Sequence, residues 1–193
     1  MSQIFQQIQF LQELDKLKSI ERQCKIVGKE RRENSAEHSW HVSMYALILS
    51  NHGPQQFDLL KVIQLLLVHD IVEIDAGDTF VYDTKARESK QLLEEEAAQR
   101  IFGLLPNDQA NFYLNLWREY ESGESPEAHF ARGLDRLQPI LQNFANQGGT
   151  WREHGIKPEQ VLERNRHIVH ASPFLWEFVQ GLVNEAIELG YFD

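Results

Sequence analysis

Hydrophobic residues recur with a helical period along most of the chain. One apolar stripe near the N-terminus predicts a first helix, and its members are Ile4, Ile8, Leu11, Leu14 and Leu17. From residue 59 to residue 68 nearly every position is apolar, which is typical of a helix buried on all sides in the middle of a bundle. No long run alternates between β-branched and polar residues, so the pattern predicts no strand.

Capping and helix-breaking residues indicate where the other helices begin and end. Asn34 and Glu37 resemble a capping box for a helix that runs toward Ser50, and the segment 51–54 breaks it. Asp58 can cap the next helix, which is expected over 57–74. Further helices are expected over 85–103, over 107–121, from 125 to 147 with a kink at Pro139, from 157, and from 172 to about 189. The prediction is an all-α fold of about seven or eight helices, with a loop at 149–155.

The length and composition are those of one globular domain. The chain has 193 residues, of which 42% are hydrophobic, and this is enough to bury a core without disulfides or a structural metal. A metal ion in such a chain is therefore expected to do chemistry rather than to hold the fold together. Cys24 is the only cysteine, so no internal disulfide can form, which suits a reducing cytoplasm.

The charge balance restricts the possible partners. Lys and Arg total 19 against 29 Asp and Glu, a formal net charge of −10, which argues against a nucleic acid polymer. A small phosphorylated substrate remains possible, because one bound cation and a few arginines can locally outweigh the negative electrostatic field of the whole protein. The longest apolar run is far shorter than the roughly 20 residues that span a bilayer. With no signal peptide pattern either, we expect a cytoplasmic protein with no membrane partner.

The residues that indicate chemistry begin with His69 and Asp70, at the end of the most hydrophobic helix. Burying a carboxylate there without compensation costs on the order of several kcal/mol. The dipeptide alone favours a simpler interpretation, in which the helix emerges into solvent. His38 in the first turn of a capped helix, and Asp135 near an apolar helix face, shift the balance toward a shared site. Glu73 follows His69 by one helical turn.

The donor set of the predicted site indicates a catalytic metal. Two imidazoles and two carboxylates suit a divalent ion such as Mn, Co, Fe, Ni, Zn or Mg. Four protein ligands leave positions open for water or substrate, as catalytic sites require. His41, one turn after His38, is interpreted as a polar helix residue, and His129 alone is weak support for a second metal. One divalent metal ion is therefore expected.

The order His38…His69-Asp70…Asp135 resembles the H…HD…D signature of the HD-domain superfamily of metal-dependent phosphohydrolases. The segments ENSAEHS at 33–39, HDIVEIDAGD at 69–78 and GLDRLQPIL at 133–141 resemble its 5′-deoxynucleotidase branch. The similarity covers about residues 10–145. It implies a single HD-type helical bundle over 1–193, with a metal-binding core at about 20–145 and C-terminal helices at 158–190 packing on it.

The same resemblance implies roles for individual residues. His38, His69, Asp70 and Asp135 would bind the metal, and Glu73 and Asp78 would serve catalysis. Arg22 matches the branch's phosphate-contacting arginine, whereas Gln23 stands where the branch has tryptophan and 79–82 replaces its proline-bearing segment. The substrate implied is a (deoxy)nucleoside 5′-monophosphate, and the assembly implied is a homodimer.

Several alternatives stay open at the level of sequence. The chain could hydrolyse another phosphate ester or a nucleoside polyphosphate, or it could be a di-iron oxygenase on the same helical scaffold. A non-catalytic helical adaptor with a vestigial metal site is the last alternative. Cys24 is interpreted as structural, and four large aromatic residues are interpreted as core or interface residues: Trp117, Tyr120, Trp151 and Trp176.

Overall fold

The computed structural model describes residues 2–78 and 87–192, with residues 87–90 given by their backbone alone. The long helices are α1 (Gln3–Leu14), α2 (Ser35–Ile48), α3 (Leu59–Val68), α5 (Arg87–Phe102), α6 (Asn107–Ser122), α7 (Pro126–Ala145), α9 (Pro158–Asn165) and α11 (Pro173–Glu188). The short elements are η1 (Asp15–Ser19), η2 (Ser50–His52), α4 (Glu73–Ala76), α8 (Gly149–Glu153) and α10 (Ile168–Ala171), with the strands β1 (Glu21–Lys25) and β2 (Arg32–Asn34). The all-α prediction is confirmed.

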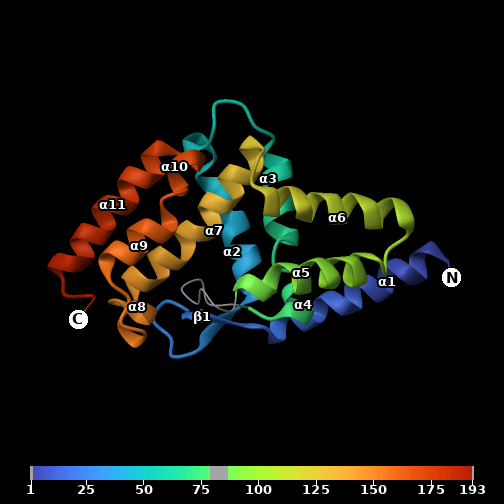
Figure 1. Cartoon of the computed structure of the whole chain (residues 1–193), viewed down its shortest axis with the longest axis horizontal. Helices are drawn as coiled ribbons and strands as arrows, with labels where there is room; N and C mark the ends of the chain where they lie inside the picture. The colour runs from blue at the N-terminus through green and yellow to red at the C-terminus, as the bar shows by residue number, and fades with distance from the viewer. Residues whose placement is uncertain (1, 79–86, 193) are drawn as a thin grey trace.

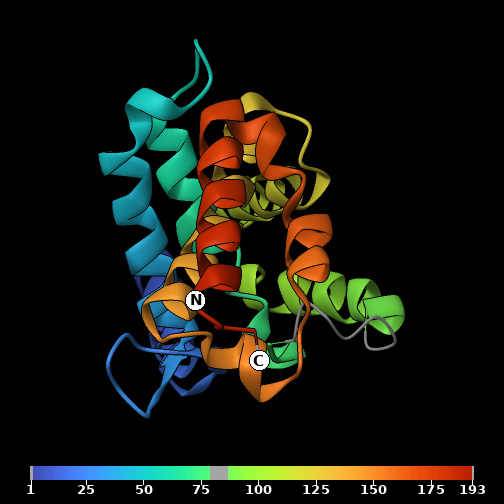
Figure 2. The same cartoon turned by 90° about the vertical axis from the view of Figure 1, so that its left-hand side faces the viewer.

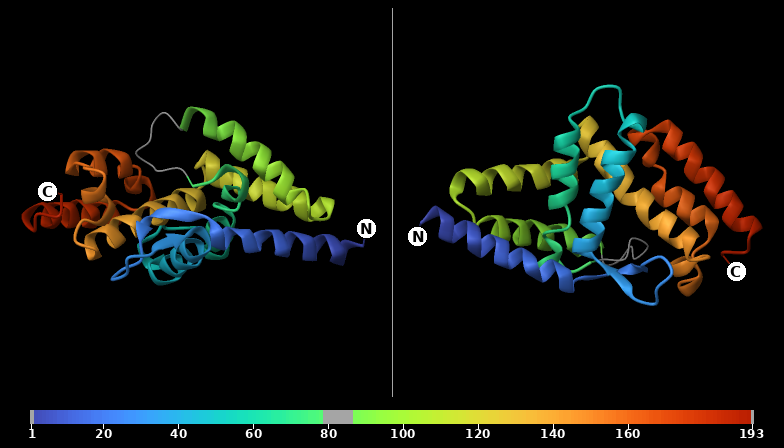
Figure 3. Two further views of the ribbon diagram at one scale, coloured as in Figure 1. Left: turned by 90° about the horizontal axis from the view of Figure 1, so that it is seen from below. Right: turned by 180° about the vertical axis from the view of Figure 1, so that it is seen from behind.

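Helix α7 is the central element (Figure 1), and the elements that pack against it are α2, α3, α6, α8, α10, α11 and β1. It begins with Ser125, whose hydroxyl accepts the Ala128 backbone N–H, and Pro126 stands in its first turn. Helices α2 and α3 lie side by side against it, as the right-hand view of Figure 3 shows. Helix α10 and the long helix α11 pack on its other side, with α11 beside α9 (Figure 2). Helices α10 and α11 therefore contact the core.

The core lies where α2, α3 and α7 meet. Leu65 and Leu66 of α3 and Leu134 of α7 are fully buried, and each such side chain contributes roughly 1.5–3 kcal/mol. Helix α10 approaches α7 closely because Gly133 has no side chain: a Cβ there would lie 2.3 Å from the Cβ of Ala171. Close packing of these helices fixes the side of α7 that carries Asp135.

The helix expected over 57–74 is interrupted, which corrects the prediction. Helix α3 ends at Val68, residues 69–72 form a turn, and α4 begins at Glu73. The periodicity could not reveal this break because the apolar pattern continues through Ile71 and Val72, both of which are buried. The turn places the His69 and Asp70 side chains at the end of α3, close to α2 and α7.

The prediction of no strand was wrong. β1 and β2 form an antiparallel hairpin in which Glu21 pairs with Asn34 and Lys25 with Arg32. The strands are short and polar, so they carry none of the β-branched alternation that identifies strands in a sequence. Asn146 at the end of α7 anchors the hairpin, since its side chain accepts the Gly28 N–H and donates to the Lys25 carbonyl.

The segment 149–155 was predicted to be a loop, and most of it is the short helix α8. Trp151 and Thr150 are buried, and the Trp151 ring stacks on Phe192 with centroids 4.7 Å apart. Trp151 is thus a core residue, as interpreted from sequence. A helix of this length is too short to show a 3.6-residue period, which explains the miss.

The apolar stripe of α1 faces outward more than expected. Ile4 is 63% exposed and Leu11 59% exposed, whereas the buried contact of α1 is Phe10, which packs near Phe102 and Tyr113. The N-terminus lies at one end of the long axis and the C-terminus near the other (Figure 1). Within residues 2–78 and 87–192, no helix has the length and hydrophobicity needed to cross a membrane.

Candidate metal centre

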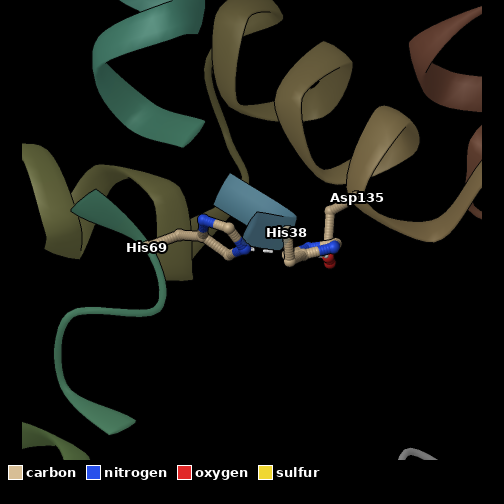
Figure 4. Close-up of side chains that lie close together, drawn as sticks. All are labelled: His38, His69 and Asp135. Carbon is tan, nitrogen blue, oxygen red and sulfur yellow. Dashed lines mark hydrogen bonds and ion pairs between the residues drawn. The ribbon is translucent and has the colours of Figure 1, made fainter. Parts of the chain in front are cut away.

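Three of the four predicted metal ligands meet in one buried cluster (Figure 4). His38 comes from the first turn of α2, His69 from the end of α3 and Asp135 from the middle of α7. Nε2 of His38 lies 3.0 Å from Oδ1 of Asp135, and Nε2 of His69 lies 3.7 Å from the same oxygen. One ligand atom from each residue lies within 4.8 Å of the others, a spacing that could hold a metal ion.

Asp70, the fourth predicted ligand, borders the same cluster. Its Oδ1 lies 3.0 Å from Nε2 of His69, and its Oδ2 lies 4.0 Å from Nε2 of His38. Arg22 Nη1 donates to Oδ2 at 2.8 Å, so one of the two oxygens is already engaged. Burial works against the charged form, but the positive His69 and Arg22 hold the pKa of Asp70 well below its usual value.

His69 presents an unsatisfied nitrogen to this cluster. Its Nδ1 donates to the Leu66 carbonyl at 2.8 Å, which fixes the proton on that side of the ring. Within the described residues its buried Nε2 makes no hydrogen bond, although carboxylate oxygens of Asp70 and Asp135 lie nearby. A ring nitrogen buried between two carboxylates is unfavourable without a positive charge at that place, which either a ring proton or a bound cation supplies. The residues therefore fit a divalent cation.

His38 is oriented by a second set of buried side chains. Its Nδ1 lies 3.1 Å from Oε1 of Gln138 and 3.5 Å from Oε2 of Glu33. Gln138 and Gln142 both donate to Oε1 of Glu33, at 2.9 and 2.8 Å. Such contacts behind a ligating histidine select the ring nitrogen that faces the metal. The sequence offered one signal for Gln138, a polar residue one turn after Asp135 on an apolar helix face.

Asp135 has partners on both of its oxygens. Tyr120 donates its hydroxyl to Oδ2 at 3.1 Å, and Nε of Arg136 lies 3.7 Å from that oxygen. Sequence reasoning treated Tyr120 only as a core aromatic residue and did not consider Arg136 as part of the site. Tyr120 is indeed buried, but its hydroxyl reaches the cluster from α6. No sequence signal brings α6 and α7 together at this point.

The predicted catalytic pair lies next to the cluster. Glu73 is buried, and the Ser35 hydroxyl donates to its Oε2 at 2.6 Å. Burial and the negative charge of Asp70 raise the pKa of Glu73 to about 8. Asp78 lines the same cavity and adds to this effect through its negative charge. The two carboxyl groups therefore share one electrostatic environment with the cluster.

Arg22, the predicted phosphate contact, projects from β1 into the middle of the carboxylates. Besides its bond to Asp70, its Nη2 lies 4.0 Å from Oδ1 of Asp135, and its buried Nε makes no hydrogen bond. Burial opposes its charge, but Asp70 and Glu73 raise the pKa of Arg22 further above its already high value. Arg22 thus stays charged at the edge of the cluster.

The other residues weighed from sequence lie outside the cluster. His41 contacts Gln138 at 3.3 Å instead, and His129 packs near His170 with ring centroids 5.9 Å apart. Asn143 donates to Sγ of Cys24 at 3.7 Å, and burial raises the pKa of that thiol to about 11. Gln23 lines the cavity, whereas the substituted segment 79–82 falls outside the described residues.

A cavity of about 810 Å³ opens onto the cluster. One wall comes from β1, α8 and α7 and includes Cys24, Asn143 and Trp151, and the other comes from α5, α6 and α7 and includes Arg118 and Arg132. Ligand pockets for small molecules span roughly 300–1,000 Å³. The cavity is therefore large enough for a substrate that extends well beyond the three clustered side chains.

A family model described as "HD domain" matches residues 14–176, which include every residue of the cluster. The chain belongs to the HD-domain family. His69-Asp70 is the His-Asp (HD) dipeptide of this chain. His38 and Asp135 complete the H…HD…D order noted in the sequence.

Named relatives and solved structures resemble this chain over much of its length. Human 5'-deoxynucleotidase HDDC2 is 32% identical over 136 residues, which are 70% of this chain and 65% of that protein, so the chain spans about two thirds of that relative's length. The Dictyostelium discoideum protein of the same name is 28% identical over 84% of this chain and 90% of its own. A crystal structure called "Predicted metal-dependent phosphohydrolase", from Magnetospirillum magnetotacticum MS-1, is 46% identical, with a TM-score of 0.94 over 99% of this chain and 98% of that one.

Proposed function

We propose that this protein is a metal-dependent phosphohydrolase that removes phosphate from (deoxy)nucleoside 5′-monophosphates. The observation that carries this proposal is the meeting of His38, His69 and Asp135, with a buried His69 nitrogen that has no hydrogen-bond partner among residues 2–78 and 87–192. The names of the relatives support the reaction class and the nucleotide substrate. The 810 Å³ cavity next to the cluster gives the nucleoside a place to bind.

His38, His69, Asp70 and Asp135 are the proposed ligands of one divalent ion. When bound, such an ion supplies Lewis acidity toward a phosphoryl oxygen and toward water. The borderline-to-hard donor set suits Mn, Co, Fe, Ni, Zn or Mg. Gln138, Glu33 and the Leu66 carbonyl hold the two imidazole rings in the required orientation.

The remaining proposed roles belong to groups around the cluster. Asp78 accepts the proton of the attacking water or donates one to the leaving oxygen. Glu73, fixed by the Ser35 hydroxyl, positions the water. Arg22 contacts the phosphoryl group with its fork of N–H donors, a geometry that lysine cannot reproduce. Its bond to Asp70 keeps it at the edge of the cluster before substrate binds.

We further propose that the protein is one domain over 1–193, that it acts in the cytoplasm, and that it forms a homodimer. The single Cys24 suits a reducing compartment. The exposed apolar side chains of α1, among them Ile4 and Leu11, offer a face for a second copy of this chain. Size-exclusion chromatography with light scattering tests for the dimer. A measured mass of 22.5 kDa, that of one chain, would contradict it.

The test of the function starts with purification without added metal, followed by elemental analysis. Phosphate release is then measured with deoxyribonucleoside and ribonucleoside monophosphates and with nucleoside polyphosphates, after adding back Mn, Co, Mg or Zn. We expect one metal ion per chain and release from monophosphates. Release only from polyphosphates, two irons per chain with oxygenase activity, or no turnover at all would each replace the proposal with one of the alternatives.

A further inference from the structure

Two arginines approach different oxygens of the Asp135 carboxylate. Nη2 of Arg22 lies 4.0 Å from Oδ1, and Nε of Arg136 lies 3.7 Å from Oδ2. Arg22 belongs to β1 and Arg136 to α7, and both line the cavity. The cluster therefore has two guanidiniums beside it, of which only Arg22 was expected from the sequence.

Arg132 lies one helical turn before Arg136 and lines the same wall. Its Nη1 donates to the backbone carbonyl of Glu121 at 2.9 Å, near the end of α6, where the helix dipole favours a positive charge. Gly123 makes this position possible, because a Cβ there would lie 2.3 Å from Nη1 of Arg132. The chain thus holds this guanidinium in place without using a carboxylate.

The positive charge of Arg132 and Arg136 is only partly balanced, since Arg136 has an ion pair with Asp135 at 3.7 Å and Glu121 lines the same cavity. In the described residues, neither Arg132 nor Arg136 donates a hydrogen bond to a carboxylate. Arg132 and Arg136 are four residues apart on one helix, a spacing at which like charges repel each other. The chain carries these two positive charges side by side although its net charge is −10. His167 is close enough to feel both charges, and within the described part of the chain its buried Nε2 has no hydrogen-bond partner. Burial and then the charges of Arg136 and Arg132 lower the pKa of His167 to about 4.

We infer that Arg136, supported by the charge of Arg132, is a second residue that contacts the phosphoryl group, in addition to Arg22. The inference rests on the proposed function, since it concerns the same cavity. The carboxylates of Asp70, Asp135 and Asp78 and the carboxyl group of Glu73 line the cavity in which a phosphate dianion must bind. Arg22 is already bonded to Asp70, and a second guanidinium adds to its attraction for the dianion.

The test measures binding of inorganic phosphate by isothermal titration calorimetry, in buffer with saturating Mn²⁺ and with metal content checked for each variant. Wild type is compared with Arg136→Gln and Arg136→Lys. The control is Arg166→Gln, which removes the same charge from an exposed position between α9 and α10. We expect Arg136→Gln to raise the dissociation constant for phosphate by roughly ten- to a hundredfold, as for loss of a hydrogen bond between charged groups. Arg136→Lys should recover part of the binding, and Arg166→Gln should match wild type.

Three results would overturn the inference. These are a wild-type protein that does not bind phosphate, an Arg136→Gln variant that binds within about twofold of wild type, and equal losses in the Arg136→Gln and Arg166→Gln variants. Circular dichroism spectra that match wild type show that each variant is folded, and Arg136→Lys provides the comparison if Arg136→Gln is not. The readout is independent of turnover. A chain that releases no phosphate from nucleotides but loses phosphate binding on Arg136→Gln would contradict the proposed function and leave this inference standing.

Discussion

Nε2 of His38 lies 3.0 Å from Oδ1 of Asp135, although 97 residues separate the two in the chain. The contact joins the first turn of α2 to the middle of α7, two helices that also share the core. Both residues are buried, and each satisfies the polar atom of the other. The orientation of the proposed metal ligands is therefore coupled to the packing of the two helices.

Asp135→Ala should remove metal binding and phosphate release together. The substitution deletes the carboxylate that approaches both imidazoles, and it removes the acceptor of the Tyr120 hydroxyl and the ion-pair partner of Arg136. Metal content by elemental analysis and phosphate release are measured on the same preparation. Asp108→Ala, at an exposed position of α6, is the matched control and should retain both. An Asp135→Ala protein that keeps its metal and its turnover would contradict the proposed site.

Gln138→Leu should weaken metal binding while leaving all four proposed ligands in the sequence. The leucine keeps the volume but removes the contact to Nδ1 of His38 and one of two amide donors to Glu33. Loss of a contact behind a metal ligand costs about 10- to 100-fold in metal affinity. Competition with a metal-binding dye measures the affinity, with Gln99→Leu on the exposed side of α5 as control. Equal affinities in wild type and Gln138→Leu would show that His38 is oriented without Gln138.

The sequence was sufficient to predict the helices with clear periods or capping residues. Asn34 and Glu37 form the predicted capping box at the start of α2, and Asp58 caps α3 through the Leu60 N–H. Ser125 likewise caps α7, which runs through Pro139 to Ala145. Each of these capping interactions joins residues that are close in the sequence, so the local sequence is enough to predict it.

The sequence was insufficient where structure depends on distant contacts. The break after Val68 and the polar hairpin of β1 and β2 arise from packing against other segments, and neither has a local signature. Three of the four proposed metal ligands lie together, and it was the resemblance to the residue order of a known family that indicated them. Tyr120 and Arg136 join the site through the packing of α6 against α7, which no spacing in the chain predicts.

Cys24 should react slowly with iodoacetamide at neutral and mildly alkaline pH. Burial raises the pKa of its thiol to about 11, and the thiolate is the reactive form. At pH 8 the thiolate fraction should be roughly 200-fold below that of a free cysteine with a pKa of about 8.5. The rate, followed by mass spectrometry on the folded protein, should rise about tenfold per pH unit up to the pKa. A rate that levels off below about pH 9 would show that the thiol is not buried as described.

Gly133→Ala should destabilise the fold without changing metal affinity. The new Cβ would lie 2.3 Å from the Cβ of Ala171, so α10 must shift away from α7. Overpacking of this kind costs about 1–3 kcal/mol, even though alanine favours the helix more than glycine does. Urea unfolding measures the loss in the free energy of unfolding.

A double variant, Gly133→Ala with Ala171→Gly, tests whether the steric clash causes the destabilisation. This pair moves the methyl group from α10 to α7 and removes the close contact, so the double variant should be more stable than Gly133→Ala alone. If the two losses simply add, the clash is not the cause of the destabilisation. Recovery in the double variant would instead establish that α7 needs a glycine at 133 only because α10 carries a methyl group at 171, and that this contact fixes the spacing behind Asp135.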